Sequence, residues 1–213
     1  MQVDAAIDTR ARLLVVAEEA VAELGPAGVT LREVARRAGL SHGAPLRHFA
    51  SLAALLAAVA TDGFRSLQAA VGDGMDAAGA GAGPRERLAG AAAGYVRFAR
   101  NRPAVFSLMF RPDVLDVSDP EYAAEGIAAF GQLRAVVEEC RADGWRADED
   151  GAQLAGALWA LVHGIADLSL QGALAVVTEN EHLHAQLAVA MRLIDLPPVS
   201  PDTDLGGRPF PPS

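Results

Sequence analysis

The chain has 213 residues, 51% of them hydrophobic, which suits one large domain or a small domain joined to a larger one. Acidic residues outnumber basic residues by 27 to 18, and the resulting formal net charge of −9 argues against sequence-independent binding to nucleic acids. The single cysteine, Cys140, excludes an intrachain disulfide and fits a reducing compartment.

The predicted fold class is all-α, with about nine helices. Good helix formers dominate the sequence, and runs of β-branched residues are nearly absent. Between Ile7 and Leu24 the apolar residues recur at the spacing of one helix face, and Gly-Pro-Ala-Gly at 25–28 ends this first helix. Thr30 and Glu33 match a capping box, in which the hydroxyl and the carboxylate accept hydrogen bonds from free amides at the start of a second helix.

Two more helix starts follow closely. The second helix runs to about Ala38, and Gly39 supplies the left-handed residue that stops it. Ser41 is placed to cap a short third helix that ends near Phe49. Ser51 is placed to cap a fourth, apolar helix.

The remaining chain predicts a larger helical region and a tail. A Gly/Ala-rich stretch at 72–88 is interpreted as a frayed helix end and a flexible loop, and Pro84 suits the start of the next helix. The later helices are expected at about 85–100, 121–142, 149–173 and 178–195, with a short apolar segment at 102–110. These elements predict an N-terminal domain at 1–60, a larger domain at 61–196 and a disordered Pro-rich tail at 197–213.

The second and third helices have the form of a helix-turn-helix unit, two short helices joined by a tight turn that contains glycine. Ala35 and Ala38 are small enough for the helices to cross closely, and the segment 29–50 holds four arginines and one glutamate in a chain that is acidic overall. The second helix of such a unit enters the DNA major groove with its N-terminus first, where free amides favour phosphate. A plain helical hairpin within a bundle is the alternative interpretation.

Several side chains of this unit are suited to contact DNA. Arg47 fits a guanine edge or a phosphate, Gly43 lets the backbone approach closely, and Pro45 lies where a missing amide costs least. Residues of the second helix are placed to reach the flanking phosphates. The predicted DNA contacts are Thr30, Arg36, Arg37, Ser41, His42, Gly43, Ala44, Arg47 and His48.

Residues 9–60 resemble the N-terminal domain of TetR-type (tetracycline-repressor-like) transcriptional regulators. The Thr-Arg start, the stretch "GVTLREVARRAGLS" and the His-Phe pair before the fourth helix all fall in register. In the C-terminal half, "YVRFARNRPAVFSLMF" and "LWALVHGIADL" resemble a TetR-type subgroup with a Trp-His-Gly signature, here Trp159, His163 and Gly164. The resemblance implies an N-terminal DNA-binding domain and a C-terminal regulatory domain.

Three positions depart from the family pattern. The family usually has an aromatic residue, often Tyr, where this chain has Leu46, a Lys where it has Leu52, and an acidic residue where it has Ala53. The Tyr and the Lys commonly bind phosphate in family members, and phosphate contacts carry much of the affinity. Binding is therefore expected either to shift onto the arginines and His48 or to be weakened or lost.

The resemblance implies a homodimer whose interface is built from the last two long helices. Apolar residues step by three and four along both helices, as packing of four helices between two subunits requires. The predicted interface residues are Leu154, Leu158, Leu161, Ile165, Leu168, Leu183, Leu187 and Ile194. Two recognition helices related by a two-fold axis would then read a palindrome with half-sites about one helical turn apart.

The resemblance also implies a ligand pocket in the C-terminal domain and repression that a small molecule relieves. Aromatic residues and a methionine at helical spacing are candidates for its lining, although such residues are more often ordinary core. His163 is either a polar contact for the effector or a buried histidine bonded to backbone or to Asp167. The candidate pocket residues are Phe98, Phe106, Met109, Phe110, Trp159 and His163.

Other features favour simpler interpretations. The apolar stretch 154–177 is long enough to span a bilayer, but its polar residues favour a buried helix pair in a protein without a membrane partner. A metal site could be formed by Glu181, His182 and His184. Positions i and i+2 do not share a helix face, so no metal is expected. Cys140 lies on an apolar stripe, and a redox sensor needs an exposed thiolate.

The sequence therefore predicts a cytoplasmic, homodimeric, DNA-binding repressor that a small-molecule effector releases from a palindromic operator. No secretory signal is visible at the N-terminus, and no enzyme motif is found, neither a G-x-S-x-G elbow nor a phosphate-binding loop. Neither enzymatic activity nor a cofactor is expected. The alternative is a ligand-binding dimer on the same fold that has weakened or lost DNA binding.

Overall fold

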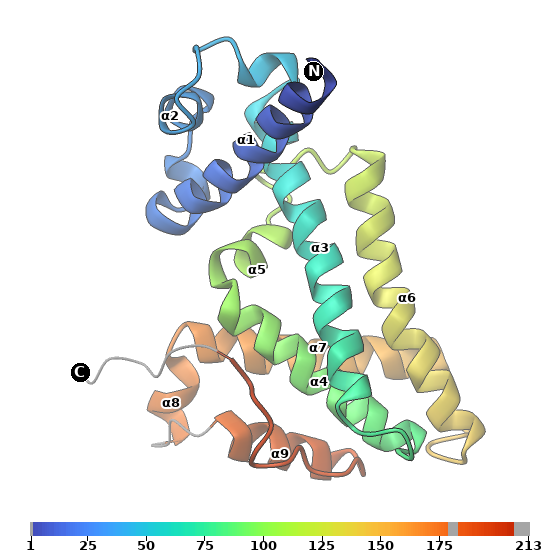
Figure 1. Cartoon of the computed structure of the whole chain (residues 1–213). Coiled ribbons are helices and arrows are strands. Elements are labelled where there is room, and N and C mark those ends of the chain that lie inside the picture. Colours follow the sequence, from blue (N-terminus) through green and yellow to red (C-terminus); the bar gives the residue numbers. More distant parts are fainter. Residues whose placement is uncertain (1, 179–182, 207–213) are drawn as a thin grey trace. The chain divides into compact units, whose positions relative to one another are not determined.

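The computed structural model describes residues 2–178 and 183–206, and within these ranges it has helices and connecting segments but no strand. This confirms the all-α prediction. In chain order the elements are α1 (Gln2–Leu24), η1 (Pro26–Gly28), α2 (Leu31–Arg37), η2 (Pro45–Arg47), α3 (Leu52–Asp76), α4 (Pro84–Asn101), α5 (Pro103–Met109), α6 (Pro120–Ala142), α7 (Gly151–Leu170), α8 (Ala173–Thr178) and α9 (Leu183–Leu193) (Figure 1).

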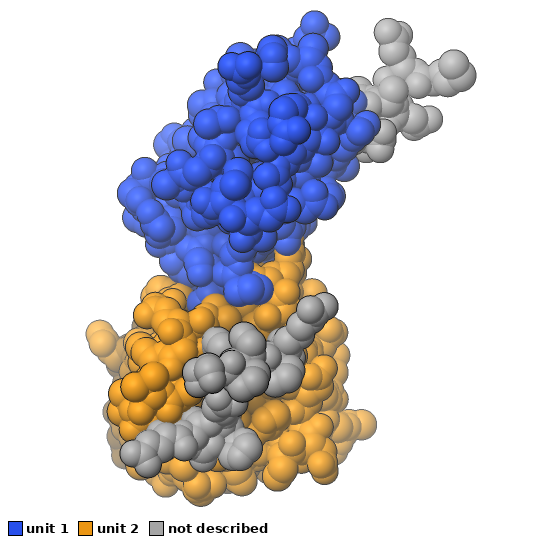
Figure 2. Space-filling model, turned by 90° about the vertical axis from the view of Figure 1, so that its left-hand side faces the viewer, with its two compact units in different colours: residues 1–64, 103–126 blue, residues 65–102, 127–213 orange. Residues whose placement is uncertain are grey.

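The chain divides into two compact units (Figure 2). The first unit comprises residues 1–64 and 103–126, and the second comprises residues 65–102 and 127–213. The N-terminal segment of the first unit thus ends close to the domain boundary that the sequence predicts at residue 60. The segment with α5 joins this unit as well, because α5 packs against α1.

The core of the first unit lies between α1, α2 and α5. Leu13, Ala17 and Val21 of α1 are buried on one helix face, as their spacing predicts. Ala35 and Ala38 are completely buried, so the small side chains stand where α2 meets its neighbours. This packing fixes the exit of α2 and hence the position of the turn that follows it.

Three of the predicted helix signals are present in the first unit. The Thr30 hydroxyl accepts a hydrogen bond from the Glu33 amide at 3.1 Å, and Gly39, with a φ of 64°, follows the end of α2. The other half of the predicted capping box is replaced, because the Glu33 carboxylate binds arginine side chains instead. The Ser51 hydroxyl accepts from the Ala54 amide at 3.0 Å and starts α3.

The predicted third helix at 41–49 is wrong. Only η2 is helical in this segment, as a single 3₁₀ turn, and no side chain caps it. Pro45 has no amide for an α-helical bond, and its ring would clash with the carbonyl four residues earlier, that of Ser41. The Ser41 carbonyl instead accepts a hydrogen bond from the Ala44 amide at 2.9 Å, which makes a tight turn in place of a first helical turn.

The second unit is held by α4 packed on α7, with α9 also against α7. The segment 72–76, expected to be frayed, continues α3 as a regular helix. Glycines explain this, because a Cβ on Gly74 would meet the Gly90 carbonyl and a Cβ on Gly94 would meet the Ala70 carbonyl. The two helices therefore approach until their backbones touch.

Two further differences concern the C-terminal region. The expected helix at 149–173 corresponds to α7, which ends at Leu170, and a separate short helix, α8, follows Gly172, which has a φ of 72°. The tail was expected to be disordered, but residues 197–206 pack on the second unit with Val199 and Leu205 buried. Residues 207–213, the rest of the predicted tail, lie outside the described residues.

Helix α7 is the one helix of the described residues that is long and apolar enough to cross a membrane. Leu154, Ala155, Leu158, Val162 and Ala166 are all buried inside its own unit. A core helix of a helical domain satisfies the same test of length and composition.

Candidate DNA-binding surface

The segment from Thr30 to His48 presents most of its predicted DNA contacts to solvent. The exposed residues of the predicted set are Thr30, Arg36, Ser41, His42, Gly43 and Arg47, and the half-buried ones are Arg37, Ala44 and His48. None of the nine is fully buried. The structure thus gathers these side chains on one short stretch of the first unit, although not on the regular recognition helix that the sequence predicts.

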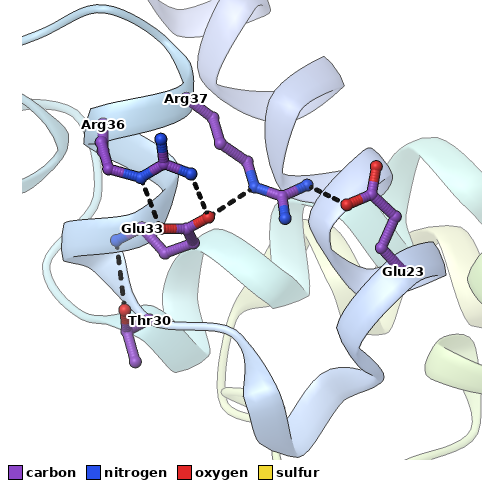
Figure 3. A network of polar contacts seen from close by, with 5 residues as sticks. All are labelled: Glu23, Thr30, Glu33, Arg36 and Arg37. Carbon is purple, nitrogen blue, oxygen red and sulfur yellow. Dashed lines mark hydrogen bonds and ion pairs between the residues drawn. The ribbon is translucent and has the colours of Figure 1, made fainter.

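Two of the predicted contacts are tied to one carboxylate (Figure 3). Arg36 donates from Nε and Nη2 to the two oxygens of Glu33, at 2.8 Å and 2.7 Å. Arg37 donates from Nε to Glu33 at 2.7 Å and forms an ion pair with Glu23 of α1, also at 2.7 Å. Arg37 therefore joins α2 to α1.

The two arginines differ in what they still offer to DNA. The side chain of Arg36 is 66% exposed and that of Arg37 only 19%. Hydrogen bonds from Arg36 and then Arg37 lower the pKa of Glu33 to about 2, so the carboxylate stays charged and holds both. A guanidinium has five N–H donors in a fixed fork, and the exposed Arg36 keeps donors for a phosphate while Arg37 mainly serves the fold.

Arg47 has a different environment. It is exposed on η2, and within the described part of the chain its guanidinium has no acidic partner. The adjoining Leu46 is 57% exposed, whereas Pro45 is buried. Arg47 is therefore the predicted contact whose full hydrogen-bonding capacity faces solvent.

Two cations that sequence reasoning missed lie beside this segment. Arg10 of α1 stacks its guanidinium 5.3 Å from the centre of the Phe49 ring. Arg12 places Nη2 3.5 Å from where a Cβ on Gly39 would lie. The available signal was their position, since they are the only basic residues before Arg32 and belong to the stretch that resembles the family.

Two arginines of α1 therefore add positive charge on either side of the turn that contains η2, Arg12 near Gly39 and Arg10 at Phe49. Arg10 and Arg12 are both exposed. Because α1 and α2 pack against each other, these arginines extend the basic surface around the turn. An acidic chain thereby acquires one local region that suits a polyanion.

Three of the predicted pocket residues lie in the second unit. Trp159 and His163 meet at the Tyr95 hydroxyl, which lies 2.8 Å from His163 Nδ1 and accepts from Trp159 Nε1 at 3.3 Å. Burial raises the pKa of Tyr95 and lowers the pKa of His163, while the charge of Asp167 opposes the second shift. Phe98, the third residue, is buried on α4. His163 is half-buried and hydrogen-bonds to Tyr95, whereas the sequence-based alternative expected a buried histidine bonded to backbone or to Asp167.

The other three predicted pocket residues lie in the first unit. Phe106 and Met109 are completely buried, and Phe106 packs edge-on against Phe110 with ring centres 5.6 Å apart. Phe64 adds a second edge-on contact to Phe110 at 5.9 Å. These residues form an aromatic core in their own unit, the ordinary alternative to a ligand lining.

The predicted dimer residues divide into inward and outward sets. Four of them, Leu154, Leu158, Leu183 and Leu187, are buried within the subunit. Three are half-buried, namely Leu161, Ile165 and Ile194, and Leu168 is exposed. The buried four serve the core of the second unit, so a stripe of apolar spacing alone did not distinguish core from interface.

Cys140 and His184 are the residues of the redox and metal interpretations that the structure describes. Cys140 is completely buried, and burial, followed by the charge of Glu139, raises the pKa of its thiol to about 11, which opposes thiolate formation. Glu181 and His182, weighed as metal ligands, lie outside the described residues. His184 contacts the Thr203 carbonyl.

Comparison with known proteins assigns both halves of the chain to one family. Residues 13–59 match the family described as bacterial regulatory proteins, tetR family, and residues 88–191 match the tetracyclin repressor-like C-terminal domain. No curated protein matches the sequence at a significant level.

Solved structures share the fold over most of its length. A protein of unknown function from Rhodococcus sp. RHA1 is 32% identical, with a TM-score of 0.74 over 87% of this chain and 95% of that chain. The TetR family transcriptional regulator PfmR from Thermus thermophilus is 21% identical, with a TM-score of 0.60 over 73% of this chain and 84% of that chain. A regulatory protein in the tetR family from Rhodococcus RHA1 is 19% identical, with a TM-score of 0.66 over 90% and 98%. Together with the matches to both domains, these likenesses show that the chain belongs to the TetR family of bacterial transcriptional regulators.

Proposed function

We propose that this protein is a homodimeric repressor that binds a palindromic DNA operator and is released by a small-molecule effector. The observation that carries the proposal is Arg47, an exposed arginine without an acidic partner in the described residues, on the turn between α2 and α3. In a chain with a net charge of −9, an arginine placed in this way is suited to a guanine edge or a phosphate. As a regulator of transcription the protein is expected to act in the cytoplasm.

The outward faces of α7 and α9 support the dimer. On α7 the exposed or half-buried residues include Ala157, Leu161, Gly164 and Leu168, and a Cβ on Gly164 would meet open space. Small residues of this kind let a second helix approach closely, and apolar neighbours favour its burial. On α9 the exposed residues Ala185, Val189 and Leu193 continue the apolar character. We assign the interface to these outward residues and to the predicted Leu161, Ile165, Leu168 and Ile194.

The effector is proposed to bind in the second unit. The Trp159 and His163 pair, which with Gly164 gives the Trp-His-Gly signature, is tied to Tyr95 of α4. A ligand that exchanges hydrogen bonds with this group would change how α4 is held against α7. The chemical nature of the ligand is best sought among molecules with both an apolar body and a polar group, since Phe130 packs edge-on against Trp159.

The test is a gel-shift titration of the full chain with DNA from upstream of its own gene and with selected random duplexes, over a range of salt concentrations. We expect a shift that weakens steeply with salt, because phosphate contacts release counterions. Arg47→Ala is expected to abolish specific binding and leave the dimer intact. The matched control is Arg134→Ala, which removes an exposed arginine of α6 and is expected to leave binding unchanged.

A salt-sensitive shift that survives in Arg47→Ala contradicts the role of that residue. No shift on any duplex contradicts DNA binding and favours the second candidate function, a ligand-binding dimer that no longer binds DNA. That candidate is supported by the 3₁₀ turn in place of a recognition helix and by the binding of Arg36 and Arg37 to Glu33. It requires that the purified dimer binds a small molecule while DNA selection enriches nothing.

A further inference from the structure

The turn η2 holds an apolar side chain and a cation next to each other in solvent. A 3₁₀ helix has three residues per turn, so each of its three side chains points about 120° away from the next. Pro45 is buried, which directs Leu46 and Arg47 to the two outward sides. Leu46 is 57% exposed and Arg47 is exposed as well.

This arrangement is fixed by its anchors. Proline restricts the backbone dihedral at the first position of the turn, and the Pro45 carbonyl accepts from the amides of His48 and Phe49, at 3.0 Å and 2.9 Å. Phe49 is 5% exposed and lies under the Arg10 guanidinium. Leu46 therefore cannot turn inward unless the buried proline and phenylalanine leave their places.

Within the described part of the first unit, Leu46 is the one large exposed apolar residue that lies in the segment with the predicted DNA contacts, Thr30 to His48. The other large apolar residues exposed in the described part of the first unit, Val15, Leu24 and Val117, lie on α1 or on the segment before α6. Leucine has no donor for a phosphate, so it cannot replace a tyrosine hydroxyl in a backbone contact. A contact of Leu46 with DNA therefore has to be an apolar one.

Base edges in the major groove offer one apolar group and one strong acceptor pair. The apolar group is the C5-methyl of thymine, and the acceptor pair is N7 and O6 of guanine, which arginine binds with two donors. We propose that Leu46 is a specificity-determining residue that contacts the C5-methyl group of a thymine adjacent to a guanine bound by Arg47. The inference rests on the proposed DNA binding and names the base step within each half-site, a thymine next to a guanine.

The test replaces thymine with deoxyuridine, which removes only the methyl group. A duplex enriched by selection with the full-length dimer is remade with deoxyuridine at one thymine of each half-site at a time, and dissociation constants are measured. For the natural chain we expect one position, adjacent to a guanine, at which affinity falls about fourfold per half-site, the change expected for one methyl-sized group removed from an apolar contact. For Leu46→Ala we expect parent and substituted duplexes to bind equally.

The control variants separate the possible failures. Leu46→Ala alters an exposed side chain, so its thermal unfolding should match that of the natural chain. Arg47→Ala, which is expected to abolish specific binding, should bind all duplexes without preference for the neighbouring guanine. Equal binding of the natural chain to all deoxyuridine duplexes overturns the methyl contact and leaves DNA binding in place. The same methyl sensitivity in Leu46→Ala also overturns it. Enrichment of no duplex at all contradicts the proposed function itself and the methyl contact with it.

Discussion

The hydroxyl oxygen of Tyr95 on α4 lies 2.8 Å from Nδ1 of His163 on α7 and also accepts a hydrogen bond from Trp159. Tyr95→Phe is expected to lower the free energy of unfolding by about 2 kcal/mol, because it removes two hydrogen bonds of partly buried groups. Urea denaturation followed by circular dichroism measures the change.

The matched control is Tyr122→Phe. Its hydroxyl donates one hydrogen bond, to the Met109 carbonyl at 3.0 Å, so the expected loss is about 1 kcal/mol. The two substitutions remove the same atom from the only two tyrosines of the chain. A loss in Tyr95→Phe no larger than that in Tyr122→Phe would show that the α4–α7 cross-link contributes no more than a single ordinary bond.

His163 should make the stability of the protein depend on pH. Burial lowers the pKa of His163 in the folded protein, against an opposing effect of Asp167. Between the folded and unfolded pKa values the unfolded chain binds more protons, so the free energy of unfolding rises with pH through this window. The contribution is complete above the unfolded pKa and is lost as the pH falls through the folded value.

The measurement compares the natural chain with His163→Gln by urea denaturation at several pH values from about 5 to 8, the range in which histidine titrates. All the other histidines are the same in both chains, so their effects cancel in the difference. We expect the advantage of the natural chain to shrink toward acid pH. A difference that stays constant over the range would contradict the role of His163 titration.

The glycine crossing of α3 and α4 should be intolerant of a single methyl group. A Cβ on Gly94 would meet the Ala70 carbonyl and would lie 3.0 Å from the Cα of Val71, and backbone atoms cannot give way as a flexible side chain does. Gly94→Ala is expected to destabilise the protein by about 1–3 kcal/mol, the usual range for overpacking. Thermal or urea unfolding reports the change.

Gly131→Ala is the control for helix propensity. Gly131 lies inside α6, and a Cβ there would meet open space. Alanine should therefore stabilise the protein by about 0.5–1 kcal/mol. Similar stabilisation in Gly94→Ala would mean that the two helix backbones do not touch at this position.

The crossing also shows what the sequence was able to predict. Periodic apolar spacing and capping residues located most helices, and the Thr30 and Ser51 caps formed as expected. Gly74, one of the glycines that allow contact between α3 and α4, lies in a stretch of sequence with the composition of a loop. Local composition does not reveal a close contact with a helix far along the chain, so the end of α3 was missed.

The segment from Thr30 to His48 shows a similar division. Its location and its exposed cations followed from the sequence, but its helical form did not, since Pro45 interrupts the pattern of amide bonds. The shared binding of Glu33 by Arg36 and Arg37 also escaped prediction, because a capping box and an ion pair use the same residue type. Arg10 and Arg12 were missed because only the tertiary packing of α1 brings them to the turn.

The outward faces of α7 and α9 should control assembly. Val189 of α9 is 45% exposed and Leu168 of α7 is 43% exposed, and in the proposed dimer both become buried against the partner. Val189→Asp should weaken dimerisation by at least about 100-fold, because a charge without a partner would be buried.

Ile127→Asp is the control, since Ile127 is 75% exposed on α6, outside the proposed interface. Light scattering on a size-exclusion column should find a monomer for Val189→Asp and a dimer for Ile127→Asp, with unchanged helical content in both. A dimer that persists in Val189→Asp at low micromolar concentration would place the interface on another face.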